Sequence, residues 1–261
     1  MTKIYVMTDM EGVSGIGTMA MIEREGTEFD RCRRLLCGDV SAAVAGAFAG
    51  GASEVVVVDA HGGGGNFIIE ELDPRGVYER SAGARHWMPS LDRSFSGLFQ
   101  VGCHAMAGTL NAFLDHTQSS TSWFRSWLGG REMGEMGQVA AIAGYYGVPT
   151  LLVTGDEAAC AEAQQFFPGI ETAPVKKANG RNNATCLHPQ RAQQLIREAA
   201  ARAVKLVGKL KPFVVEVPAE VKLTVTRADY VDGLGERPGV ERVDARTVRK
   251  TIDCVLDLIS F

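Results

Sequence analysis

The sequence lacks two features that mark whole classes of protein. No stretch approaches the roughly 18 consecutive apolar residues that a membrane-spanning helix requires. There is no basic excess either, since 27 Lys and Arg residues stand against 31 Asp and Glu residues and the formal net charge is -4. Proteins that bind nucleic acid through phosphate contacts are usually strongly basic. We therefore expect no membrane insertion and no nucleic-acid partner.

Cysteine pairs and a leader segment are missing as well. The six cysteines are scattered without a C-x-x-C arrangement, so the sequence signals neither a disulfide framework nor a cysteine zinc site. The first residues, MTKIYVMTDMEG, leave no room for the basic and apolar regions of a signal peptide. We expect a cytoplasmic protein whose cysteines are mostly small buried side chains. Cys103 is of special interest because it stands beside His104.

The sequence does contain a regular alternation of short β-branched runs and longer alanine-rich segments. Strands are expected at 4–7, 55–58, 98–101 and 150–153, and helices at 29–48, 138–146, 157–166 and 189–207. The second of these strands is apolar throughout, which is typical of a strand buried on both faces. The pattern predicts an α/β protein with a largely parallel sheet flanked by helices on both faces.

The last third of the chain has a different pattern. Strands are expected at 213–217 and 220–225, and a closing helix at 246–259. We therefore divide the chain into an α/β catalytic domain, residues 1–211, which carries the candidate metal ligands, and a smaller C-terminal α+β subdomain, residues 212–261, packed on it. Between Val175 and Pro212 there is a local excess of Lys and Arg, which we interpret as a solvated helix face.

Polar side chains that can bind a metal follow three of the expected strands. Asp9 and Glu11 come after the first, Asp59 and His61 after the second, and His104 after the third. Ligands of parallel α/β sheets bind beyond the carboxyl ends of the strands, so these groups should meet at one edge. Carboxylates mixed with imidazoles suit a divalent transition metal, with zinc first and manganese, cobalt or iron not excluded. Spacing alone leaves the number of ions open.

Each of these residues also has an ordinary structural explanation. Asp9 would serve as a loop cap that accepts hydrogen bonds from backbone amides, and Glu11 as a solvated turn residue. Either histidine would serve as a hydrogen-bonded core residue. No single position is specific, and only their occurrence at successive strand ends favours a metal site.

The run Gly62–Gly65 follows His61 directly. It has neither the residue order nor the lysine of a phosphate-binding loop, so it argues little for nucleotide binding. We interpret it as a loop that lets a substrate or a metal approach the backbone. The sequence assigns no role to His86, and it explains His188, which precedes Pro189, as the residue that begins a helix.

Five stretches together give the chain a family resemblance. They are TDMEGVSG at 8–15, DAH at 59–61 with Asn66, GCHA at 102–105, GEMG at 134–137 and AGYYGVP at 143–149. In order and spacing, over essentially the whole chain, they resemble the bacterial D-aminopeptidases encoded in dipeptide-transport operons. The glycine run after His61 and the segment 81–88 depart from the family pattern, which implies a different substrate pocket because loops carry recognition.

The resemblance implies roles for particular residues. In that family two zinc ions are held by the counterparts of five residues of this chain, Asp9, Glu11, His61, His104 and Glu135. The aspartate bridges both ions, and the histidine matching His116 is the catalytic side chain. Without the resemblance, Glu135 is an ordinary glutamate at a helix start. His116 is then an undistinguished loop histidine.

The resemblance also implies an activity and an assembly. The activity is that of a zinc-dependent aminopeptidase that hydrolyses short peptides or amides with an N-terminal D-amino acid through a metal-activated water, with His116 as proton donor or as nucleophile. Two alternatives stay open, a related amidase or other hydrolase on the same dinuclear site, and a non-catalytic protein that binds a metal or a small amine. His116 favours an enzyme, since a binding protein needs no proton-transfer group. The implied assembly is a large ring-like homo-oligomer, a decamer, and the aromatic stretch 123–128 would be an interface or simply core.

Overall fold

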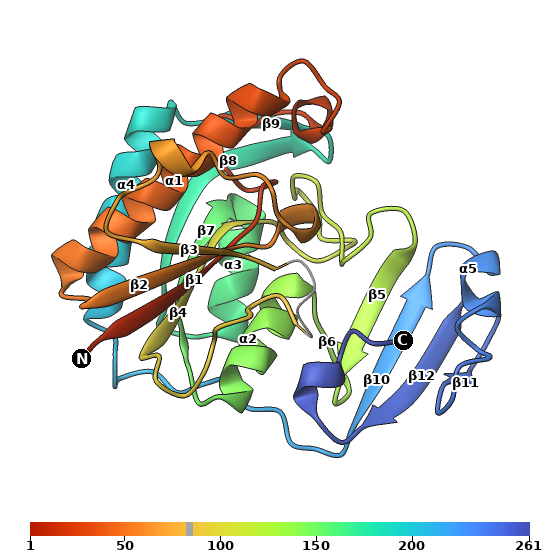
Figure 1. Ribbon diagram of the computed structural model, residues 1–261. Helices are drawn as coiled ribbons and strands as arrows, with labels where there is room; N and C mark the ends of the chain where they lie inside the picture. Colours follow the sequence, from red (N-terminus) through yellow and green to blue (C-terminus); the bar gives the residue numbers. More distant parts are fainter. Residues whose placement is uncertain (82–85) are drawn as a thin grey trace.

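The computed structural model describes residues 1–81 and 86–261, which form two sheets and the helices packed on them (Figure 1). The larger sheet contains β1 (Lys3–Thr8), β2 (Glu54–Asp59), β3 (Val77–Arg80), β4 (Gly97–Cys103), β7 (Thr150–Asp156), β8 (Glu171–Gly180) and β9 (Asn183–Cys186). The smaller sheet contains β5 (Trp123–Leu128), β6 (Arg131–Glu132), β10 (Ala219–Val225), β11 (Glu241–Arg242) and β12 (Thr247–Ile252).

The helices are α1 (Phe29–Gly50), α2 (Glu135–Tyr145), α3 (Glu157–Phe166), α4 (Pro189–Val204) and α5 (Asp229–Asp232). Four short 3-10 segments complete the description, η1 (Met19–Ile22), η2 (His61–Gly63), η3 (Ile69–Glu71) and η4 (Val255–Asp257). No helix in the described part of the chain combines the length and the apolar character that a membrane crossing requires.

The larger sheet has the strand order β3-β2-β1-β4-β7-β8-β9 and is parallel except for the β8–β9 pair. Alternate residues of β1 serve two cores. Ile4 and Val6 belong to the core that contains α1 and α4, while Tyr5 and Met7 belong to the core that contains α2 and the smaller sheet. The predicted α/β fold, with helices on both faces of a largely parallel sheet, is confirmed.

The strand order creates a natural binding position. From β1 the chain moves outward through β2 and β3, and β4 then returns to the other side of β1. The carboxyl ends of β1 and β4 therefore flank a topological switch point, where ligands of open α/β sheets bind. Asp9 follows β1 and His104 follows β4, so both lie at this point.

The smaller sheet is antiparallel and has the order β11-β12-β10-β5-β6. Three of its strands come from the C-terminal part of the chain, while β5 and β6 come from residues 123–132. The aromatic stretch 123–128 is thus a strand, whose Ser126 and Leu128 are buried while Phe124 is exposed. The division of the chain between residues 211 and 212 stays a prediction.

Two expectations for the C-terminal part are wrong. Residues 246–259 do not form a helix, because 247–252 are strand β12 and only the short segment η4 follows. The alternation in TVRKTI explains this, since Val248 is buried opposite Leu223 while Arg249 points outward. The expected strand at 213–217 is irregular backbone, and Val217 there is 45% exposed.

Candidate metal centre

The loop after β1 is joined to the end of β4 through backbone contacts. The Asp9 amide donates to the Val101 carbonyl at 2.8 Å, and the Gly12 amide donates to the Gly102 carbonyl at 2.7 Å. A Cβ on Gly12 would overlap the carbonyl oxygen of Cys103, and a Cβ on Gly102 would overlap that of Asp9. Glycine at both positions therefore allows the two loops to approach closely enough to bring their side chains together.

We expect Gly12→Ala to lower the free energy of unfolding by about 3 kcal/mol, because the added methyl group has only backbone to displace. The same change should weaken zinc binding, since it separates the loops that carry Asp9 and His104. Urea unfolding and a competitive zinc titration measure the two effects. Gly233→Ala, where nothing lies within 4 Å of an added Cβ, is the control. A Gly12→Ala protein as stable as this control would contradict the close approach.

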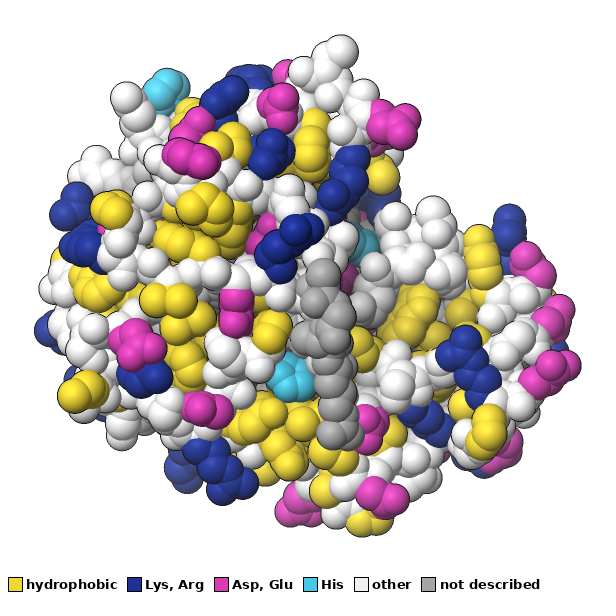
Figure 2. Space-filling model, viewed as in Figure 1, with side chains coloured by type: hydrophobic (Ala, Val, Ile, Leu, Met, Phe, Trp, Pro, Cys, Tyr) yellow, Lys and Arg dark blue, Asp and Glu magenta, His cyan; other side chains and the backbone are white. Residues whose placement is uncertain are grey.

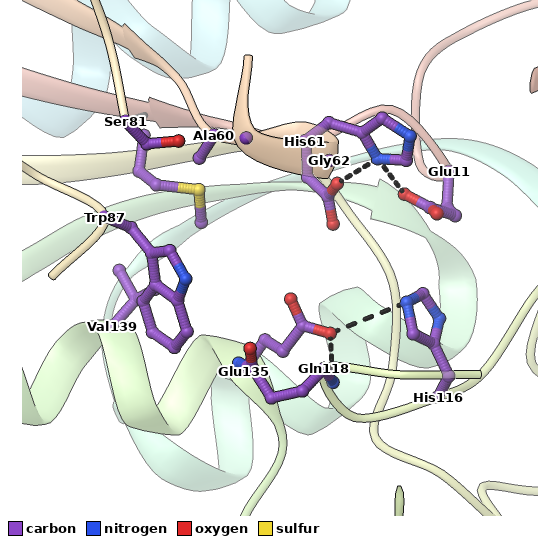
Figure 3. Close-up of a pocket in the computed structure, with 13 residues that line it drawn as sticks. Glu11, Ala60, His61, Gly62, Ser81, Trp87, His116, Gln118, Glu135 and Val139 are labelled. Atoms are coloured by element: carbon purple, nitrogen blue, oxygen red, sulfur yellow. Dashed lines mark hydrogen bonds and ion pairs between the residues drawn. The ribbon is translucent and has the colours of Figure 1, made fainter. Parts of the chain in front are cut away.

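The first group of candidate ligands consists of Asp9, Glu11 and His61. The Nδ1 atom of His61 lies 2.9 Å from Asp9 Oδ1 and 3.1 Å from Glu11 Oε2 (Figure 3). The ligand-capable atoms of all three residues lie within 4.8 Å of one another. A carboxylate pair facing one imidazole in this way can hold a metal ion.

The second group consists of His104, His116 and Glu135, whose ligand-capable atoms also lie within 4.8 Å of one another. Glu135 Oε1 lies 3.4 Å from His104 Nε2 and 3.6 Å from His116 Nε2, and the two imidazole rings are stacked with centroids 3.9 Å apart. Asp9 links the groups, because its Oδ2 lies 3.3 Å from His104 Nε2 while its Oδ1 faces His61. The structure thus brings together all six residues to which the family resemblance gives a role as ligand or catalytic group.

Two buried atoms in this cluster fit a metal ion. His104 Nδ1 lies 2.9 Å from the Ala105 carbonyl oxygen, which can only accept, so Nδ1 carries a proton and Nε2 is the nitrogen available to a metal ion. That Nε2 atom and Glu11 Oε2 are both buried, and neither makes a hydrogen bond in the described structure. Buried polar atoms without a hydrogen bond are costly, and a metal ion bound at each group would satisfy them.

The electrostatics of the cluster also favour bound positive charge. Burial alone raises the pKa of Glu11, but the imidazoles of His61, His104 and His116 outweigh it and hold the pKa well below its usual range. Burial lowers the pKa of His104, yet the carboxylates of Glu135 and Asp9 raise it well above its usual value. The carboxylates therefore attract either protons or metal ions to this site, and the two compete.

His116 is held with one nitrogen turned towards the cluster. Its Nδ1 donates to the Leu114 carbonyl oxygen at 2.8 Å, which leaves the lone pair on Nε2, facing Glu135. The Gln118 amide donates to Glu135 Oε1 at 2.7 Å and fixes the same carboxylate from the other side. This orientation suits His116 to act either as a base or as a metal ligand.

A buried lysine supports the loop that carries Glu11. Lys176 Nζ donates to the Glu11 carbonyl oxygen at 2.7 Å and to the Ile16 carbonyl oxygen at 2.6 Å. Its interpretation as part of a solvated helix face is wrong, since Lys176 lies on β8 and is only 3% exposed. No sequence signal indicated this role, because it depends on packing of β8 against the distant loop after β1.

A buried aspartate supports the same loop. Asp39 on α1 accepts hydrogen bonds from the Ser14 amide at 2.8 Å and from Ser14 Oγ at 2.7 Å. Burial raises the pKa of Asp39 from 3.8 to about 6, against the opposing effect of these hydrogen bonds. The folded protein therefore binds a proton at Asp39 between about pH 4 and pH 6 that the unfolded chain has lost.

The free energy of unfolding should therefore fall as the pH rises from about 4 to about 6. Asp39 should account for about 3 kcal/mol of this fall, and above about pH 6 its contribution should stay constant. Asp39→Asn should remove this contribution. Urea unfolding of both proteins from pH 4 to pH 7 in the presence of a chelator measures the difference. Asp30→Asn, an exposed carboxylate on the same helix, is the control. Parallel pH curves for wild type and Asp39→Asn would contradict the shift.

The cluster opens into a pocket of about 430 Å³. Trp87 and Val139 lie at the opposite end of this pocket from His116 and Glu11, with Ser81 nearby (Figure 3). The sequence offered no signal for this apolar wall, because its residues come from distant segments without a motif. Of the segment 81–88, which departs from the family pattern, residues 82–85 lie outside the described structure.

Other residues singled out from the sequence have supporting roles. Asp59 is not among the candidate ligands, because its carboxylate accepts from the Asn66 amide at 2.6 Å and from Asn66 Nδ2 at 2.7 Å and so shapes the loop after β2. His188 caps α4 by accepting from the Gln190 amide, as expected. Burial raises the pKa of the Cys103 thiol well above its usual value, so this cysteine is not an activated nucleophile.

His86 is buried outside both candidate ligand groups. Its Nε2 lies 3.3 Å from the Tyr146 hydroxyl, and its Nδ1 accepts from the Met88 amide at 3.3 Å. These contacts join the segment after β3 to the C-terminal end of α2. His86 is therefore a hydrogen-bonded core histidine.

Comparison with known proteins gives one consistent result. The family model Peptidase_M55, described as D-aminopeptidase, matches residues 2–261. A curated D-aminopeptidase from Bacillus subtilis (strain 168) is 31% identical over 229 residues, which is 87% of this chain and 82% of that relative. Among solved structures, the chain is similar to the zinc-dependent D-aminopeptidase DppA from Bacillus subtilis, described as a self-compartmentalizing protease. The TM-score is 0.95 and the identity 28%, over 98% of this chain and 94% of the other.

Proposed function

Since the chain belongs to the D-aminopeptidase family Peptidase_M55, we propose that it is a zinc-dependent aminopeptidase that removes an N-terminal D-amino acid from short peptides or amides. The observation that carries this proposal is the pair of ligand groups joined through Asp9, with two buried atoms that lack a hydrogen bond. The family and the similar zinc enzyme support the same reaction.

We assign the ligands as follows. One zinc ion would be held by Glu11 and His61 and the other by His104 and Glu135, with Asp9 shared because its two oxygens face the two groups. Zinc in such a pair supplies Lewis acidity towards a carbonyl group and a water-derived nucleophile at neutral pH. The mixture of carboxylates and imidazoles is a donor set that zinc accepts readily.

His116 would move the proton. Its Nδ1 is held by the Leu114 carbonyl, so the Nε2 lone pair is available at the pocket wall. There it would take a proton and deliver it to the leaving nitrogen, or act as nucleophile. The Gln118 amide holds Glu135 Oε1, the oxygen that lies 3.6 Å from His116 Nε2, and so fixes the carboxylate beside the imidazole.

The stereochemistry of hydrolysis tests the proposal. Zinc-loaded protein should hydrolyse D-alanyl p-nitroanilide with a kcat/KM at least about 100-fold above that for the L-enantiomer. A preference for the L-compound would contradict a D-aminopeptidase. If zinc-containing protein hydrolyses neither compound, the result would instead favour another hydrolase or a binding protein.

We also propose that the protein works as a homo-oligomer, since the similar structure is a self-compartmentalizing protease. Large apolar side chains at the surface, such as Leu110 at 86% exposure and Val214 at 64%, are candidates for the contacts. Light scattering of the purified protein gives the stoichiometry, for which a decamer is our prediction. A cytoplasmic location likewise stays a prediction.

A further inference from the structure

The backbone of the run Gly62–Gly65 has positive φ angles throughout, which glycine residues allow. The four residues have φ values of +56°, +81°, +85° and +95°, a region that other residues rarely adopt. Gly62 and Gly63 line the same pocket as the candidate metal ligands. The loop therefore brings bare backbone to the rim of the site.

Two arginines pack on this bare backbone. Arg24 Nη2 donates to the carbonyl oxygens of Gly62 at 3.2 Å and Gly64 at 3.1 Å. A Cβ on Gly65 would lie 2.9 Å from Arg80 Nη2 and 3.8 Å from Arg24 Nη1. The absence of side chains in the loop thus lets two guanidinium groups approach the same point from different parts of the chain.

Neither guanidinium is neutralised within the described structure. Nearby arginines such as Arg31, Arg33 and Arg34 each pair with a carboxylate, whereas Arg24 and Arg80 take part in no ion pair among the described residues. Both side chains are exposed, and no hydrogen bond from the Arg80 guanidinium group to another described residue is present. Two like charges held close together without a counter-ion favour an external anion.

The arginines stand at the edge of the catalytic pocket. Arg80 ends β3, and the next residue, Ser81, lines that pocket. Figure 2 shows Lys and Arg side chains beside the hollow in which Asp, Glu and His atoms are visible. A ligand that reaches from the metal ligands past the glycine loop would meet this positive charge.

We propose that Arg80, together with Arg24, binds the C-terminal carboxylate of a short peptide substrate. This inference rests on the proposed function and narrows its substrate class from peptides and amides to short peptides with a free carboxyl terminus. A guanidinium group suits the task, because it binds a carboxylate through two parallel hydrogen bonds. With the amino end at the metal ligands and the carboxylate at Arg80, the peptide is held at both ends in a pocket of about 430 Å³.

The test compares D-alanyl-D-alanine with its C-terminal amide, which has the same shape without the charge. For the wild-type enzyme we expect kcat/KM to be about tenfold higher for the free acid. Arg80→Gln should bring the two substrates to within about twofold of each other, through a higher KM for the acid at an unchanged kcat. Higher salt should reduce the wild-type preference, because the subsite is exposed.

Arg227→Gln, which removes an exposed arginine paired with Asp229, is the control and should keep the wild-type preference. Equal kcat/KM values for the acid and the amide in the wild type would refute carboxylate binding at Arg80 without affecting the proposed aminopeptidase activity. An equal loss of kcat/KM for both substrates in Arg80→Gln would refute it as well. If the wild type hydrolyses neither, the proposed function fails. In that case, calorimetry measures the binding of the same two compounds to zinc-loaded protein. Carboxylate binding at Arg80 requires that the acid bind more tightly than the amide in the wild type, and that the two bind equally in Arg80→Gln.

Discussion

Replacing His116 by alanine should lower kcat for D-alanyl p-nitroanilide by about a thousandfold, while the zinc content stays at two ions per chain. The reason is geometric. The Leu114 carbonyl accepts the Nδ1 proton of His116, so the only free nitrogen of the ring is turned towards the pocket and Glu135. Five other residues remain to hold the metal, and the loss should therefore fall on proton transfer or nucleophilic attack alone.

The same variant separates the two roles that the geometry allows. His116 lies in a ligand group with His104 and Glu135, so a ligand role would show as a fall in zinc content with the fall in rate. His188→Ala, which removes a histidine that only caps α4, should retain zinc and keep kcat within about twofold. An unchanged kcat in His116→Ala would refute the catalytic assignment, and loss of one zinc ion would replace it with a ligand role.

Replacing Asp9 by alanine should have the second large effect, loss of both zinc ions and of activity by at least about a thousandfold. Among the residues of the two groups, Asp9 is the one that contacts both, with Oδ1 2.9 Å from His61 Nδ1 and Oδ2 3.3 Å from His104 Nε2. Its removal also leaves the imidazoles of His61 and His104 without the carboxylate that contacts both. Loss of a ligand shared by two ions should therefore weaken both sites.

Metal analysis and a competitive zinc titration measure this effect. Glu11→Ala provides a comparison, because Glu11 belongs to one group only and its loss should remove about one ion. The exposed variant Asp30→Ala is the control and should behave as wild type. Two ions retained in Asp9→Ala would show that the groups bind zinc independently of the shared carboxylate.

The strands β1, β2, β4 and β7 were predictable because each contains a mainly apolar run, whereas β3, with the sequence VYER, was not expected. Val55–Val58 reads as a buried strand in sequence and is one in the structure. The last third was harder. The strand β12 contains Arg249 and Lys250 among its β-branched residues, and it is a strand because it pairs with β10, a contact that local sequence does not reveal.

The residues of the candidate site also fall into those that the sequence indicates and those that it does not. Asp9, His61 and His104 follow strands directly, so the topology of a parallel sheet brings them together and the sequence indicates it. Glu135 begins a helix and His116 lies in a loop, and only the resemblance to a family singled them out. Lys176 and Trp87 had no such support, because their roles depend on packing between segments far apart in the chain.

The most direct test of the central claim, two zinc ions in one catalytic site, is a titration of metal-free protein with zinc while the initial rate of D-alanyl p-nitroanilide hydrolysis is followed. The two groups joined through Asp9 predict a rate that is negligible without zinc and reaches its plateau at two equivalents per chain. A plateau at one equivalent, or full activity in metal-free protein, would contradict the claim.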